Sequence, residues 1–165
     1  MKANHSTPVM QQDYKAFYRY VFGMVLSPSH SENILRRAYC QYKKVSHHTD
    51  AREGQFVILN LLHREIHRHL MENGPTNSPL LTQWQTAIAR LPLRYREPLL
   101  LQSVLSIDNT VMATLLSIDE ETLKERLLRG HSVLRKLDDR ESAYLDLWPF
   151  TEKPRFNQAK FHYVT

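Results

Sequence analysis

The stretch that decides the fold reads LSIDNTVMATLLSIDEETLKERLLRGHSVLRKL over residues 105–137. Its first part predicts a short amphipathic helix over Asp108–Leu116, and its second part predicts a longer one over Asp119–Leu137. Asp119 is a good N-cap because its side chain can accept a hydrogen bond from the first turn of the second helix. Two helices joined by a turn of about three or four residues indicate a helix-turn-helix, although a plain helical hairpin has the same pattern. The buried stripe expected on the second helix consists of Leu123, Leu127, Val133, Leu134 and Leu137.

The rest of the chain also predicts an all-α protein. Only four of the 165 residues are glycine, and strand-like alternation between turns is scarce. Apolar residues at helical spacing predict further helices, in which Pro98 is tolerable only in a first turn. These helices are expected at Gln12–Met24, from Ser29 to Lys44, at Gly54–Met71, at Leu80–Leu91 and at Tyr95–Leu105.

A short polar segment divides the chain. Residues 73–79 read NGPTNSP, a composition that cannot sustain a helix, so we expect a linker there. It separates two small helical domains, over residues 10–72 and 80–137. Residues 138–165 form an aromatic-rich C-terminal extension, which either completes the core or binds a partner.

Charge and composition narrow the functional class. The net charge of +5 and a pI near 9.4 favour a polyanionic partner. Cys40 is the only cysteine, which excludes an intramolecular disulfide and a cysteine-cluster zinc site. The N-terminus lacks the apolar core of a signal peptide, and no apolar run approaches the roughly 20 residues of a membrane helix. We therefore expect a cytoplasmic protein with no membrane insertion.

A resemblance to a known family sharpens this interpretation. Residues 87–101, AIARLPLRYREPLLL, resemble the opening of region 4 in sigma-70 family factors of the extracytoplasmic-function type, and residues 107–137 follow the family's helix-turn-helix without a gap. The front half is similar to region 2 of the family, mainly in the order and spacing of its helices. The positions that match within the helix-turn-helix are Ala113, Leu116, Ile118, Thr122, Lys124, Arg126, Leu127 and Leu137.

The resemblance implies a sigma-factor-like transcription initiation protein, which binds bacterial core RNA polymerase and promoter DNA. The first domain would contact the −10 element, with Arg64 and Arg68 on the nucleic-acid side. The helix-turn-helix would contact the −35 element, and an anti-sigma factor or another regulatory protein is a further candidate partner. The residues expected at the DNA in the second domain are Glu121, Thr122 and Glu125 near the bases, with Lys124, Arg126, Arg129 and Arg135 at the phosphates.

Departures from the family pattern support an alternative. Asn33, Arg36 and Arg37 stand where the family offers acid and amide to the polymerase clamp, and a reversed charge changes which partner is tolerated. Glu120 and Glu121 begin the recognition helix, where carboxylates face phosphates poorly. The alternative is a diverged sigma-like adaptor that binds another protein or transcription complex without reading a promoter. A plain helix-turn-helix repressor would dimerise, and the sequence has no dimerisation stripe.

A metal site is weighed and set aside at this stage. His63 and His67 are four residues apart on one helix face, a spacing that can hold Zn²⁺. The metalloprotease motif needs Glu directly after the first His, where this chain has Arg64, and zinc deaminases need paired cysteines. A third ligand would have to come from elsewhere. We therefore expect no metal or cofactor, and without a Gly-rich phosphate loop, a nucleophile elbow or a paired-acid constellation we expect no enzyme.

Overall fold

The computed structural model describes residues 7–45, 51–74 and 83–138, with side chains for 14–45, 53–74 and 85–136. Nearly every residue in these ranges is helical and none is in a β-strand, which confirms the predicted all-α class. The helices are α1 (Thr7–Val25), α2 (Pro28–Val45), α3 (Ala51–Asn73), α4 (Gln83–Arg90), α5 (Leu93–Leu105), α6 (Asn109–Leu116) and α7 (Glu120–Asp138).

Every predicted helix is present, but several ends differ. Helix α1 begins at Thr7 instead of Gln12, and residues 80–82, expected to open the fourth helix, lie outside the described residues. The position expected for Pro98 is wrong. The Pro92 carbonyl accepts hydrogen bonds from the N–H groups of Tyr95 and Arg96, so α5 begins at Leu93 and Pro98 falls in its second turn. Because proline has no N–H, that turn lacks one helical hydrogen bond.

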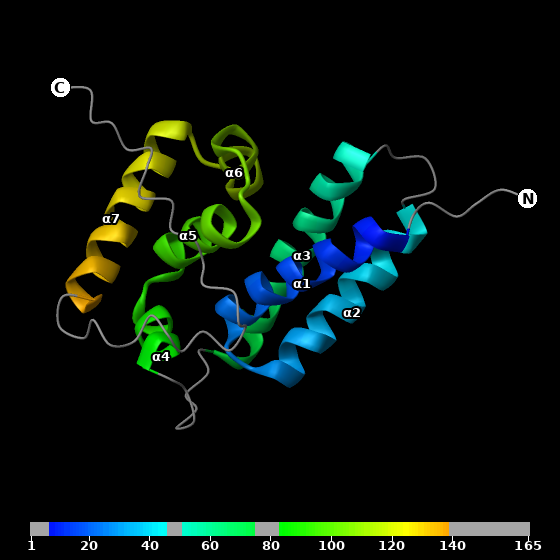
Figure 1. Ribbon diagram of the computed structural model, residues 1–165, viewed down its shortest axis with the longest axis horizontal. Coiled ribbons are helices and arrows are strands. Elements are labelled where there is room, and N and C mark those ends of the chain that lie inside the picture. Colours follow the sequence, from blue (N-terminus) through cyan, green and yellow to red (C-terminus); the bar gives the residue numbers. More distant parts are fainter. Residues whose placement is uncertain (1–6, 46–50, 75–82, 139–165) are drawn as a thin grey trace, which may run out of the picture.

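Helices α1, α2 and α3 pack against one another to form one half of the molecule (Figure 1). Apolar residues of α1 recur every three or four positions, so they line one face of the helix. Tyr20, Val21 and Met24 on this face are fully buried, as are Leu35 of α2 and Leu62 of α3. The three-helix arrangement therefore has an apolar interior of its own.

Helix α5 lies between α1 and α7 (Figure 1). Its residues from Tyr95 to Leu101 are all buried, as expected for a helix covered on every side. Two glycines allow the close approach. A Cβ atom at Gly23 of α1 would lie 2.8 Å from Leu100 Cδ1, and one at Gly130 of α7 would lie 2.6 Å from a methyl carbon of Leu99.

Buried Arg96 of α5 forms hydrogen bonds to the ends of two other helices. Its guanidinium donates hydrogen bonds to the carbonyl oxygens of Met24 at 3.1 Å and Leu91 at 3.0 Å, and also to that of Ala89. These carbonyls lie at the C-terminal ends of α1 and α4, where helices leave acceptors unpaired and favour positive charge. One side chain of α5 therefore satisfies the ends of two neighbouring helices.

The buried apolar side chains of both sequence halves form one continuous cluster, from Phe17 of α1 to Leu127 of α7. Helices α1 and α5, from opposite sides of the predicted domain boundary, pack directly against each other. The division into domains 10–72 and 80–137 therefore stays a prediction. The C-terminal extension and most of the linker lie outside the described residues. None of the helices in the described ranges combines the length and the apolar character that crossing a membrane requires.

Candidate functional site

Helices α6 and α7 form the pair of helices joined by a short turn that the sequence predicts. Only residues 117–119 separate them. Ser117 adopts a left-handed conformation, φ 53° and ψ 44°, and its N–H bonds to the carbonyls at the end of α6. The N–H of Ile118 donates to the Ala113 carbonyl at 3.0 Å, which completes the C-terminal cap. The chain thus turns sharply between the two helices.

Asp119 starts α7 as expected. Its carboxylate accepts hydrogen bonds from the backbone N–H and the hydroxyl of Thr122, at 2.7 and 2.8 Å. These bonds hold the pKa of Asp119 below its ordinary value. The N-cap interpretation is confirmed, and the Thr122 hydroxyl is already engaged within the protein. Thr110 of α6 also donates to Glu120 at 2.9 Å, which joins the two helices across the turn.

The inner face of α7 differs from the predicted stripe at one position. Leu123, Leu127 and Gly130 are buried, but Val133 is 39% exposed. Successive residues are about 100° apart around a helix, so Val133 is turned away from half-buried Leu134, which continues the inner face. The side chain of Leu137 lies outside the described residues.

The predicted DNA-contacting residues of α7 are mostly exposed. Glu125 and Arg129 form an ion pair at 2.5 Å, one helical turn apart. Arg126 and Thr122 are half-buried, and therefore less available than expected to a partner. The exposed members are Glu121, Lys124, Glu125, Arg129 and Arg135.

The residues predicted for α2 and for α3 are all exposed, but the two arginines of α3 also form intramolecular contacts. Asn33, Arg36 and Arg37 are all exposed, and Arg36 donates to the Asn33 amide oxygen at 2.7 Å. Arg64 of α3 donates to the side-chain oxygen of Gln41 on α2, and Arg68 pairs with Glu65 on its own helix. Both arginines expected at the −10 element are thus held by intramolecular contacts.

A cluster of polar side chains joins α3 to α5. Glu97 of α5 is buried, with its side chain 5% exposed. His63 Nδ1 lies 2.7 Å from Glu97 Oε1, and His67 Nε2 lies 2.8 Å from Oε2. The hydroxyl of Tyr20, from α1, donates to Oε1 at 2.8 Å. We call Tyr20, His63, His67 and Glu97 the Glu97 cluster; it connects the two sequence halves.

The electrostatics of the Glu97 cluster keep this carboxylate ionised. Burial alone would raise the pKa of Glu97, but hydrogen bonds from His63 and His67 lower it to about 2. The bond to Glu97 also raises the pKa of His67. Burial, reinforced by the negative charge of Glu97, raises the pKa of Tyr20 well above its ordinary value, so the hydroxyl keeps the proton it donates. The cluster is thus a buried anion surrounded by donors.

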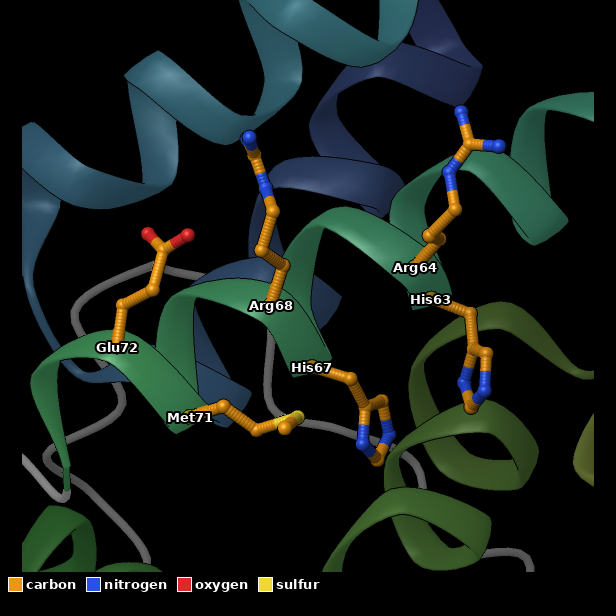
Figure 2. A pocket seen from close by; sticks show the side chains of 6 residues that line it. All are labelled: His63, Arg64, His67, Arg68, Met71 and Glu72. Carbon is orange, nitrogen blue, oxygen red and sulfur yellow. The ribbon is translucent and has the colours of Figure 1, made fainter.

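Histidines 63 and 67 open onto the surface on their other side. Their side chains are 27% and 37% exposed, and Figure 2 shows both imidazoles pointing away from Arg64 and Arg68. They border an open cavity of about 560 Å³. The residues that line this cavity are His63, Arg64, His67, Arg68, Met71 and Glu72.

The sequence predicted the histidine pair but missed Glu97, which supplies the third group. A signal for it was present. Glu97 stands within the run Tyr95–Leu101, which is buried throughout, and a carboxylate in such a run needs charged or hydrogen-bonding partners. The identity of the partners was not readable, because they lie 30 or more residues away in sequence.

Comparison with known proteins adds no relative. No protein-family model matches the chain, and no curated protein matches it significantly. The resemblance to sigma factors therefore rests on the residues quoted for it.

Proposed function

We propose that this protein is a sigma-factor-like transcription initiation protein, which binds promoter DNA through α6 and α7 and core RNA polymerase through its first half. The observation that carries the proposal is the capped α6–α7 pair with an exposed, charged face on α7. Lys124 and Arg135 are exposed on this helix, available to phosphate oxygens once it enters a major groove, whereas exposed Arg129 is paired with Glu125. The Asp119 cap fixes the start of the proposed recognition helix directly after the turn.

The exposed face of α2 supports a protein partner for the first half. Asn33, Arg36 and Arg37 lie on the side opposite Ile34 and Leu35, which are buried against α1 and α3. A paired, solvent-facing group of this kind suits docking on an acidic protein surface, because complementary charge speeds association and selects the partner.

DNA binding is tested with the tag-free protein, core RNA polymerase and fluorescent genomic promoter fragments. We expect Lys124→Ala to weaken binding similarly on all fragments and to reduce the slope of log K against log salt by about 1, the value for one lost phosphate contact. Lys43→Ala removes another exposed lysine, on α2, and serves as the matched control. An unchanged affinity and salt slope for Lys124→Ala would exclude α7 as the recognition helix.

Polymerase binding is tested by co-elution with the core enzyme on a sizing column. We expect Arg36→Glu to abolish co-elution, and Lys44→Glu, a charge reversal on the same helix, to retain it. Co-elution of both variants would exclude the Arg36 surface as the docking site.

The adaptor remains a second candidate because of one observation. Glu120 and Glu121 are exposed in the first turn of α7, where they would repel phosphates. An adaptor predicts co-elution with a transcription complex but no change in promoter affinity when Lys124 is replaced. The two experiments above therefore separate the candidates.

A further inference from the structure

Three potential metal ligands converge in the Glu97 cluster. One ring nitrogen of His63, one ring nitrogen of His67 and a carboxylate oxygen of Glu97 all lie within 4.8 Å of one another. The two imidazoles come from successive turns of α3, with ring centroids 4.3 Å apart, and the carboxylate comes from α5. Metal–ligand bonds of about 2.0–2.2 Å in a tetrahedral site set the ligand atoms roughly 3.3 Å apart. The nitrogen–oxygen separations of 2.7 and 2.8 Å involve different oxygens of Glu97 and would open by about 0.5–0.6 Å, while small side-chain rotations would bring all three ligand atoms, now within 4.8 Å of one another, to this spacing.

We propose that His63, His67 and Glu97 bind a divalent transition-metal ion, and that Zn²⁺ is the ion this donor set fits best. Two imidazole nitrogens and one carboxylate oxygen are characteristic zinc ligands, and three protein ligands leave a fourth position open. Ca²⁺ and Mg²⁺ are unsuited, because they prefer shells built from oxygen alone.

The surroundings of the three ligands suit an ion. The Tyr20 hydroxyl, fully buried, donates to Glu97 Oε1 and so fixes the carboxylate, as groups behind metal ligands commonly do. Figure 2 shows Arg64 and Arg68 directed away from the imidazoles, although both arginines line the same cavity.

The open cavity gives the ion a route from solvent. It borders both imidazoles, while Glu97 lies behind them, covered by α3 and α5. An ion entering there replaces the two histidine–glutamate hydrogen bonds with coordinate bonds. It then joins α3 to α5, helices of opposite sequence halves. The zinc proposal does not rest on the proposed function.

The test is zinc binding by the tag-free, metal-depleted full chain, measured by calorimetry with Zn²⁺ alone and by the visible absorption of Co²⁺ as a tetrahedral probe. We expect one ion per chain, a tetrahedral Co²⁺ spectrum, and a thermal midpoint raised by about 5–10 °C when zinc is a hundredfold above its Kd. His67→Gln is the informative variant. A glutamine amide can still donate to Glu97, but it is a poor zinc ligand, so affinity should fall at least tenfold.

A second histidine pair provides the matched control. His30 and His69 have ring centroids 4.5 Å apart, but among the described residues no third ligand completes a metal-binding group with them. The double variant His30→Gln with His69→Gln should bind zinc as the unchanged protein does. Glu97→Gln serves as a further test if the metal-free His67→Gln protein is not folded by circular dichroism.

Three results would overturn the proposal. These are the absence of zinc binding by the unchanged chain, equal zinc affinity in the His67→Gln variant, and loss of binding in the His30 and His69 control. A Co²⁺ spectrum of octahedral type would also contradict it, because it indicates an ion held mainly by water.

Discussion

Replacing Tyr20 by Phe tests whether the Glu97 cluster holds the two halves of the molecule together. Tyr20 is fully buried in α1, and its hydroxyl donates to Glu97 of α5 at 2.8 Å across 77 residues of sequence. Phenylalanine retains the ring and creates almost no cavity. The substitution therefore removes one buried hydrogen bond between α1 and α5 while leaving the apolar packing in place.

The size of the effect follows from the charge on the acceptor. Hydrogen bonds to charged groups contribute about 1.5–3 kcal/mol, more than those between neutral groups. Glu97 keeps its bonds to His63 and His67, so the carboxylate is not left without partners. We expect Tyr20→Phe to lower the free energy of unfolding by about 1.5–3 kcal/mol, which corresponds to a thermal midpoint about 3–12 °C lower for a chain of this length.

The assay is urea unfolding of the metal-depleted protein, followed by far-ultraviolet circular dichroism at neutral pH. Tyr14→Phe is the matched control, because Tyr14 lies on the same helix with its side chain exposed. Native-state hydrogen exchange adds a second measurement. Tyr20→Phe should increase exchange in both α1 and α5 if the two helices are stabilised together.

A loss below about 0.5 kcal/mol, equal to that of Tyr14→Phe, would refute the reasoning, since surface changes fall in that range. Increased exchange in α1 alone would refute the coupling of the halves. Either result would reduce the Glu97 cluster to a local contact.

Further outcomes follow from other contacts. Gly130→Ala should destabilise the protein by about 1–2 kcal/mol in urea unfolding, because crowding of Leu99 outweighs the helix propensity gained. Gly23→Ala should cost less, because within 3 Å its new Cβ atom would contact only side-chain methyl groups. Asp119→Ala should lower the thermal midpoint by about 2–4 °C through loss of the α7 cap, and Asp119→Asn should largely retain it. Burial lowers the pKa of His131, so the unfolded chain binds more protons below the ordinary value of 6.5, and stability present above pH 6.5 is lost as pH falls. His131→Gln should reduce that loss between pH 7.5 and 5.5, and an unchanged pH dependence of the thermal midpoint would contradict the assignment.

The helices were predictable because their signals are local. Asp119 and Thr122 are three residues apart, and the capping bonds that they form lie within one turn. The predicted start of α5 was wrong for a local reason as well. Pro92 and Pro98 compete to mark the first turn, and only the hydrogen bonds accepted by the Pro92 carbonyl decide between them.

The Glu97 cluster was only half predictable because its parts meet through packing. The spacing of His63 and His67 is a property of one helix, and it was read correctly as a pair on one face. Their contact with Glu97 depends on how α5 is seated between α1 and α7, with Gly23 and Gly130 allowing its close approach. The residue periodicity of a single helix does not predict how α5 packs between α1 and α7.

The proposed function requires the two halves to separate. Elements centred at −10 and −35 are 25 base pairs apart, or about 85 Å at 3.4 Å per pair. A compact body of the size of the described residues has a radius of gyration of about 13–14 Å and a diameter of about 35 Å. With α1 packed on α5, this body cannot reach both elements at once. Binding must therefore break the contacts that Tyr20→Phe weakens.

Pulsed electron–electron double resonance can measure the distance between the two halves. Cys40 on α2 is exposed and is the only cysteine, and Leu128→Cys adds an exposed site on α7, so two spin labels report on the two halves. We expect one short distance in the free protein and a distance several tens of ångströms longer in the complex with core polymerase and promoter, by the arithmetic above. Tyr20→Phe should shift the equilibrium toward the separated form, because it weakens only the packed one. A complex that initiates transcription with the short distance unchanged would mean that the protein does not contact both elements at once, and α7 alone would then account for any promoter binding.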